Sequence, residues 1–141
     1  MKVSEVLRGK GDEVVTIAPE TTVRELVQTL RQHNIGAIVV STSENPVAGI
    51  VSERDVVRAI ANGVEVLDSP VSAIMTSKVR TATLDDTVHD LMRLMTEHRF
   101  RHVPVVVDDR LHGIVSIGDV VKSRIGELEF ERDQLESYVS R

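Results

Sequence analysis

The chain has 141 residues, of which 41% are hydrophobic and 28% are charged, and its formal net charge is −5. This composition is typical of a globular protein, and the length suffices for one core or for two small halves. The absence of cysteine excludes disulfides, thiolate metal sites and cysteine nucleophiles. The acidic balance argues against general binding to nucleic acid or anionic membranes, because both depend on accumulated positive charge.

The first residues, Met1 to Glu5, lack the apolar core of a signal peptide. No apolar run approaches the roughly 20 residues that a helix needs to span a bilayer. A chain without cysteine is also compatible with a reducing compartment. We therefore expect a soluble, cytoplasmic protein without a membrane partner.

The chain opens with a short apolar segment at residues 3–7, followed by a turn at 8–13 that is rich in glycine and charge. A β-branched run at 14–17 predicts a strand, which Pro19 ends. A helix is expected from Thr22, where Thr22 and Glu25 have capping-box spacing. The apolar residues of this helix are spaced for one buried stripe, at Val23, Leu26, Val27 and Leu30.

Two further strands and a helix complete the first unit. Residues 37–40 follow Gly36 as a run of apolar, mostly β-branched residues and predict the second strand. Residues 47–51 lie beyond a turn that contains Pro46, and they predict its hairpin partner. A second helix is expected from about Glu53 to Ala61.

The same order returns in the second half of the chain. The sequence GIVSERDVV at residues 49–57 reappears as GIVSIGDVV at 113–121, and a near-copy of this length indicates two related units. Residues 71–75 correspond to the opening segment, and residues 79–83 to the first strand. The helix and next strand also return, as the stripe Val88, Leu91, Met92 and Met95 and the run 103–107.

These correspondences predict three parts: a first unit at residues 1–65, a second at 66–125, and a helical tail at 126–141. Only the tail has no counterpart elsewhere in the chain. Its apolar residues, together with the last of the second unit, fall on one helical stripe at Ile125, Leu128, Leu135, Tyr138 and Val139.

The repeated Ser-x-x-Asp pattern lies where a strand leads into a helix. Ser52 with Asp55, and Ser116 with Asp119, have the spacing of a capping box, which stabilises a helix by about 1 kcal/mol. Capping alone would account for them. An alternative is a nucleoside site, because a helix N-terminus and a serine hydroxyl suit a phosphate. An ionised aspartate one turn later can accept hydrogen bonds from both ribose hydroxyls.

With these motifs the chain resembles a tandem pair of cystathionine-β-synthase-type (CBS) domains. The resemblance rests on residues 49–55 and 113–119, with support from 16–19, 80–83 and 100–105. It extends from residue 1 to about 125. It implies an α/β fold of two β-α-β-β-α repeats related by a pseudo-twofold axis, here followed by a C-terminal helix.

In similar proteins, adenosine nucleotides are held by this serine and aspartate, with the adenine against the first strand of each unit and basic residues on the phosphates. Carried over to this chain, the resemblance implies contacts from Thr16, Ile17, Ile35, Gly36, Ala37, Ser52, Arg54, Asp55, Thr81, Phe100, Arg101, His102, Pro104, Ser116 and Asp119. Arg54, Arg101 and His102 would meet phosphate. The two units differ at these positions, which argues against two equivalent phosphate sites.

We therefore expect a regulatory module that senses AMP, ADP, ATP, NAD or S-adenosylmethionine and passes this state to an unidentified protein. We expect no catalysis and no required cofactor. We also expect no metal site, because His98 and His102 lie across a helix end without a carboxylate nearby. One alternative is a structural dimerisation module with empty clefts, and another is an enzyme acting on nucleotides. A homodimer is expected, because the helical stripes exceed what two small sheets can cover.

Overall fold

The structure is a computed structural model, which describes residues 1–11 and 14–140. Helices and strands alternate in the order that the sequence predicts, so the α/β class with a C-terminal helix is confirmed. The elements are α1 (Val3–Lys10), β1 (Thr16–Ile17), α2 (Val23–His33), β2 (Ala37–Val40), β3 (Gly49–Ser52), α3 (Glu53–Ile60), the 3-10 turns η1 (Val64–Asp68) and η2 (Val71–Ala73), α4 (Val88–His98), β4 (His102–Val107), β5 (Arg110–Ser116) and α5 (Ile117–Val139).

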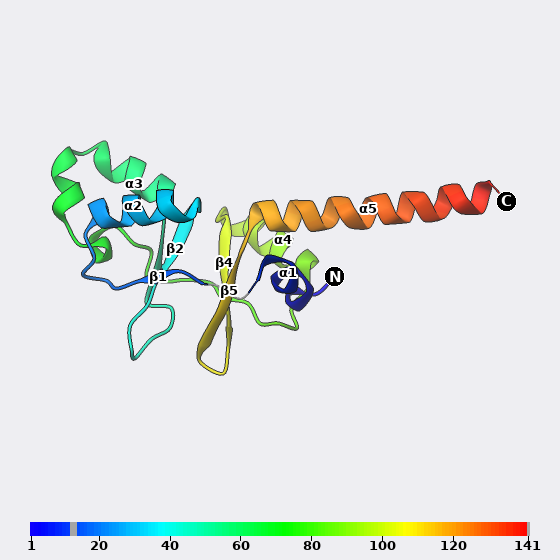
Figure 1. Ribbon diagram of the computed structural model, residues 1–141, viewed down its shortest axis with the longest axis horizontal. Helices are drawn as coiled ribbons and strands as arrows, with labels where there is room; N and C mark the ends of the chain where they lie inside the picture. The colour runs from blue at the N-terminus through cyan, green and yellow to red at the C-terminus, as the bar shows by residue number, and fades with distance from the viewer. Residues whose placement is uncertain (12–13, 141) are drawn as a thin grey trace.

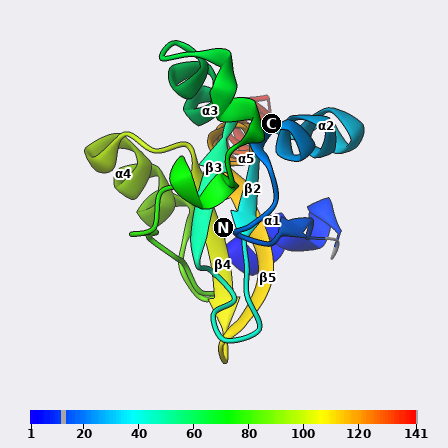
Figure 2. The same cartoon turned by 90° about the vertical axis from the view of Figure 1, so that its left-hand side faces the viewer.

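Two small sheets lie side by side in the middle of the molecule, with helices on both sides (Figure 1). In the first sheet, β1 runs parallel to β2, and β2 is antiparallel to β3. The second sheet is the antiparallel pair β4 and β5. The registers correspond, because Ala37 lies opposite Ser52 in one sheet and His102 lies opposite Ser116 in the other. Figure 2 shows the same elements end-on, with α2, α3 and α4 around the strands.

The first strand of each unit is shorter than expected. In the first unit only Thr16 and Ile17 are in a strand. In the second unit the prediction of a strand at 79–83 is wrong, because only Ala82 bridges to β4, through hydrogen bonds of 2.9 Å to Pro104 and Val106. The chain turns away after this bridge, because the amide of Thr83 donates to the Asp86 carboxylate at 2.8 Å.

The two hydrophobic cores exchange their opening segments. Val3 and Leu7 of α1 pack in the second unit's core, beneath α4 and β5, whereas Val71 of η2 packs in the first unit's core, beneath α2 and β3. Equivalent hydrogen bonds hold the two segments, from Val3 N to Asp86 O at 2.8 Å and from Val71 N to Thr21 O at 2.7 Å. The predicted ranges 1–65 and 66–125 follow the duplication in the sequence, but packing interleaves the two units.

The turn expected at residues 8–13 begins later than predicted. Residues 8–10 continue α1, and the helix is capped at Gly11, whose φ of 93° lies in the left-handed region. Asp12 and Glu13 fall outside the described residues, as does Arg141 at the end of the tail. The segment between α3 and residue 70 contains the 3-10 turn η1.

The expected tail is not a separate helix. It continues α5, which begins at Ile117 and runs for 23 residues without a break. Beyond the sheets, α5 extends away from the rest of the molecule (Figure 1). None of the helices among the described residues is both long and apolar enough to span a membrane.

Candidate ligand-binding clefts

Both repeated Ser-x-x-Asp motifs form complete capping boxes. The Ser52 amide donates to Asp55 Oδ2 at 2.8 Å, and the Asp55 amide donates back to Ser52 Oγ at 3.3 Å. The corresponding distances at Ser116 and Asp119 are 2.9 Å and 3.1 Å. Each serine hydroxyl also donates to Oδ2 of its aspartate, at 3.1 Å and 2.9 Å. All hydrogen bonds from the described residues to these two carboxylates reach Oδ2, and none reaches Oδ1.

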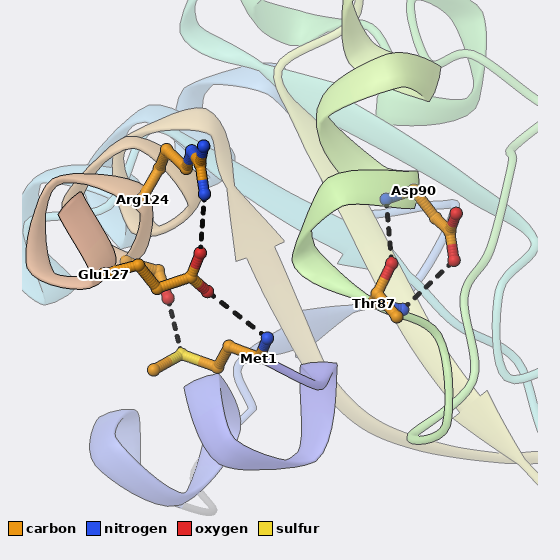
Figure 3. A network of polar contacts seen from close by, with 6 residues as sticks. Met1, Thr87, Asp90, Arg124 and Glu127 are labelled. Carbon is orange, nitrogen blue, oxygen red and sulfur yellow. Dashed lines mark hydrogen bonds and ion pairs between the residues drawn. The ribbon is translucent and has the colours of Figure 1, made fainter. Parts of the chain in front are cut away.

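The starts of α2 and α4 have threonine in place of serine at the N-cap. Thr87 and Asp90 form a capping box, shown in Figure 3, and its hydrogen bonds lower the pKa of Asp90. At α2 the Glu25 amide donates to Thr22 Oγ1 at 3.2 Å, but the reciprocal half of the box is not formed. Capping therefore accounts for the helix starts, but it does not explain why serine and aspartate recur at α3 and α5.

Each motif lies beside the beginning of a strand from its own unit. The Glu53 amide donates to the Gly36 carbonyl at 2.9 Å, and the Ile117 amide donates to the Arg101 carbonyl at 2.8 Å. Gly36 and Arg101 are therefore equivalent positions. The first unit has a glycine at this position and the second has an arginine. The two candidate sites therefore differ in charge and in the space that side chains leave for a ligand.

The larger cleft has a volume of about 530 Å³ and is lined by both units. The second unit contributes Ser116 and His102, whereas the first contributes the segments on either side of α2. From the predicted set it contains Ile35, Gly36, Ala37, His102 and Ser116, and it adds Leu7, Lys10, Gly11, Val14, Val15, His33, Asn34, Ile38, Val39, Gly113 and Ile114.

The smaller cleft, of about 140 Å³, is built around Ser52 and Asp55. Here the first unit supplies the motif, and the second unit supplies the segment before its bridge to β4. The predicted residues present are Ala37, Ser52, Asp55, Phe100, Arg101 and His102, and the others are Ile50, Thr76, Lys78, Val79 and Arg80. Each cleft thus joins the motif of one unit to the opening segment of the other.

The remaining predicted residues lie outside the described linings. Thr16, Thr81 and Arg54 are exposed, whereas Pro104 is buried in β4. The partly buried Ile17 packs on the first core. Asp119 is not a lining residue of the larger cleft, but it contacts two that are, Ser116 and Lys10.

An ion pair distinguishes Asp119 from Asp55. Lys10 Nζ lies 2.7 Å from Asp119 Oδ2 and donates to the Ile114 carbonyl at 2.8 Å. Burial raises the pKa of Asp119, but the hydrogen bonds from Lys10 and Ser116 outweigh it and hold this pKa below its ordinary value. Burial, and then the charge of Lys10, lower the pKa of His102. His102 is therefore neutral at pH 7.

Lys10, Lys78 and Arg80 were missed by sequence reasoning. These basic residues lie between the opening segment and the first strand of each unit, and this shared position in the repeat is the signal that could have found them. That position indicates a binding role only once the exchange of opening segments is known, because the exchange brings each of these basic residues to the Ser-x-x-Asp motif of the other unit. Among residues 1–11 and 14–140, no three histidine, aspartate or glutamate side chains gather as a metal site.

Comparisons with known proteins agree with this architecture. A family model described as the CBS domain matches residues 3–62 and 71–126. The crystal structure of the CBS-domain containing protein ATU1752 from Agrobacterium tumefaciens is 46% identical, with a TM-score of 0.84, and the match covers 88% of this chain and 99% of that one.

Two further solved structures contain adenosine derivatives. The CBS domain protein PAE2072 from Pyrobaculum aerophilum, complexed with AMP, is 34% identical with a TM-score of 0.76, and the match covers 84% of this chain and 89% of that one. The CBS domain pair of protein MJ0100, in complex with 5-methylthioadenosine and S-adenosyl-L-methionine, is 26% identical with a TM-score of 0.80. That match covers 90% of this chain and 98% of the other. Both matches are long enough to include the two units.

Proposed function

This chain belongs to the CBS-domain family as a tandem pair of CBS domains, and on that premise we propose that it is a regulatory module that binds an adenosine-containing ligand. The observation that supports this most is that Oδ1 of Asp119, beside a cleft lined by both units, accepts no hydrogen bond from residues 1–11 or 14–140. A carboxylate oxygen in that place can accept from a ribose hydroxyl, and the ligand would then join the two units.

We propose the larger cleft as the main site. Its volume of about 530 Å³ falls within the range of roughly 300 to 1,000 Å³ that is usual for small-molecule sites. The smaller cleft, at about 140 Å³, would have to open before it admits a nucleotide. The ligands of the two relatives support AMP, 5-methylthioadenosine or S-adenosylmethionine as the chemical class, since all three carry an adenosine moiety.

We propose no catalytic step. The hydroxyls of Ser52 and Ser116 donate to the aspartates of their own helices at 3.1 Å and 2.9 Å. This arrangement stabilises a helix start, whereas a nucleophilic serine needs a base positioned to remove its proton. The module would act through the change that a ligand causes in the contact between its units.

We also propose a homodimer. Most of the predicted helical stripes are buried within one chain, at Val23, Leu26, Leu30, Val88, Leu91 and Met95. Other apolar residues on the helices remain exposed, notably Val57 at 68% and Val27 at 39%. Exposed apolar side chains on neighbouring helices favour a symmetric partner surface.

Isothermal titration with adenosine, AMP, ATP, NAD and S-adenosylmethionine tests the proposal. We expect saturable binding of at least one of them, with a tenfold or greater loss of affinity in Asp119→Asn. Such a loss is the effect of one charge-assisted hydrogen bond of about 1.5 to 3 kcal/mol. Asp55→Asn is the matched control for the smaller cleft. A loss in Asp55→Asn alone would move the site to that cleft.

Absence of binding by any of the five compounds would favour the alternative of a structural dimerisation module. Each asparagine variant also alters a capping box, which is worth about 1 kcal/mol. Thermal unfolding followed by circular dichroism separates this effect from ligand binding. Asp119→Asn is expected to melt at a slightly lower temperature than Asp55→Asn, because both lose part of the same capping box and Asp119→Asn also loses the ion pair with Lys10.

A further inference from the structure

Helix α5 presents to solvent an apolar seam that Arg132 interrupts. Its residues recur at the heptad positions a and d, with Ile125, Arg132 and Val139 at a and Val121, Leu128 and Leu135 at d. The five apolar members are all exposed, from 47% at Val121 and Leu128 to 80% at Val139. Sustained a and d spacing is typical of a helix that packs lengthwise against another helix.

The seam faces away from the rest of its own chain. The body-facing side of α5 is formed by Val120, which is buried, and by Ser123 and Glu127, which contact Met1. Figure 3 shows the Glu127 carboxylate between Arg124 and the Met1 amino group, at 3.0 Å and 3.3 Å. These positions lie on the opposite side of the helix from a and d. The chain's own module therefore cannot cover the seam.

The outer half of α5 also extends past the part of the chain that the family model matches. The CBS family match ends at residue 126, whereas the helix continues to Val139 and stands clear of both sheets (Figure 1). All residues from Leu128 to Ser140 are exposed. A helical stretch of this length is marginal in water without a packing partner.

We propose that α5 pairs in parallel and in register with α5 of a second copy of this chain, as a short two-stranded coiled coil. The choice of residues favours this assembly, because β-branched residues at a with leucine at d specify parallel dimers. Ile125 and Val139 occupy a, and Leu128 and Leu135 occupy d. This pairing goes beyond the proposed ligand binding and does not depend on it.

Charge agrees with this register at two places. Arg124 at position g lies within reach of Glu129 at position e of the second copy, and Arg132 at a is flanked by Glu131 at g of that copy. Glu131 at position g faces Glu136 at position e of the second copy, and this repulsion weakens the coiled coil. A single charged residue at a, here Arg132, fixes the register at a cost in stability.

The coiled coil would also fix the orientation of the homodimer. Helices α3 and α5 occupy equivalent places in the two units, since each follows the same motif. If the second unit of one chain faced the first unit of the other, α5 would lie beside α3 and the two seams would be separated. Pairing of the seams selects the dimer in which the two second units are adjacent.

Disulfide crosslinking tests this proposal directly, because the natural chain has no cysteine. In a parallel, in-register pair Leu135→Cys meets itself across the seam, whereas Ser137→Cys, at the outward position f, does not. We expect mild oxidation at micromolar concentration to convert most Leu135→Cys into a covalent dimer and to leave Ser137→Cys mainly monomeric on a non-reducing gel. Equal crosslinking of the two variants, or none in either, overturns the proposal.

A second measurement concerns Arg132. Replacing it by leucine removes like charges from the seam, so Arg132→Leu is expected to raise the melting temperature of the full chain and the fraction of dimer in light scattering. Asp133→Leu, at the outward position b, is the control for added hydrophobicity. An effect of Arg132→Leu no larger than that of Asp133→Leu contradicts the coiled coil.

Discussion

Lys10 and Asp119 form an ion pair of 2.7 Å that joins α1 to the first turn of α5. The lysine belongs to the first unit, and the aspartate belongs to the repeated motif of the second. Asp55, the equivalent aspartate, forms no ion pair with any residue in 1–11 or 14–140. Two copies of one motif therefore have different electrostatic environments, because among the described residues a lysine forms an ion pair with Asp119 and not with Asp55.

The first prediction concerns ligand preference in the larger cleft. Lys10→Met removes a cation that competes for Asp119 and that can also attract a phosphate. The affinity for adenosine is expected to rise by up to about tenfold. The affinity for AMP is expected to rise less, because its phosphate loses the Coulombic attraction of Lys10. Calorimetric titration of both ligands gives the ratio of affinities. Lys78→Met, in the smaller cleft, serves as the control, and an unchanged AMP-to-adenosine ratio in Lys10→Met contradicts this role.

The second prediction concerns acid stability. The pKa of Asp119 is lowered in the folded state, so its stabilising contribution is complete above the ordinary carboxylate range and is lost as pH falls through the folded pKa. Lys10→Met is expected to reduce the stability that is lost between pH 7 and pH 3 by about 1 kcal/mol, because the pair is partly exposed. Urea unfolding at the two pH values measures this. Asp90 and Glu127 contribute equally in both proteins and cancel in the comparison. The charge of Lys10 also lowers the pKa of His102, so its removal reduces the loss of stability from that histidine in the same direction.

The third prediction concerns His102, which lines both clefts. Burial lowers the pKa of His102 below its ordinary value, so the unfolded chain binds the proton more readily than the folded one. Stability must therefore fall as pH decreases below the unfolded pKa, until it reaches the folded pKa. His102→Asn is expected to flatten this decline between pH 7 and pH 5. A decline of the same size in the variant would assign it to another group.

Much of the fold follows from the duplication. The pairing of β2 with β3 follows from two apolar runs on either side of a turn, and this hairpin was predicted from local pattern. The prediction of a strand at residues 79–83 is wrong for a local reason. Its β-branched pattern is real, but the Thr83 amide bonds to Asp86 and the chain leaves the sheet.

The candidate site was predictable only in part. Ser116 and Ser52 are visible in the sequence because they recur, and they line the two clefts. Lys10 is far from both motifs along the chain, and nothing local connects it with Asp119. Only the exchange of opening segments between the cores brings it there, and such an exchange depends on long-range packing.

The fourth prediction concerns the ends of α2 and α4, which both terminate in a left-handed residue. Asn34 has φ of 52° and Arg99 has φ of 58°. Asparagine tolerates this conformation, whereas arginine pays about 1 kcal/mol or more. Arg99→Gly is therefore expected to stabilise the chain by about 0.5 to 1 kcal/mol in urea unfolding, and Asn34→Arg should destabilise it. Stabilisation by both substitutions, or by neither, would contradict this explanation.

Gly49 and Gly113, the first residues of the repeated motif, each allow an opening segment to approach its sheet. A Cβ added at Gly49 would lie 2.5 Å from Met75 Sδ and 3.0 Å from the Thr76 carbonyl oxygen. At Gly113 it would lie 2.8 Å from a terminal methyl carbon of Leu7. The repeated glycines therefore have a packing role that is separate from the serine and aspartate.

The fifth prediction is an order of stability among three alanine variants. Gly49→Ala is expected to cost about 1 to 3 kcal/mol, because overpacking against a backbone carbonyl requires the chain itself to shift. Gly113→Ala should cost less, since a leucine methyl group can move more easily than a backbone atom. Gly126→Ala is the control, because a Cβ there meets nothing within 4 Å and alanine favours a helix interior over glycine by about 0.5 to 1 kcal/mol. Urea unfolding should therefore rank Gly126→Ala above the natural chain, then Gly113→Ala, then Gly49→Ala. If Gly113→Ala proves less stable than Gly49→Ala, the α1 segment is packed more rigidly than the segment at Met75, and the explanation from backbone contact fails.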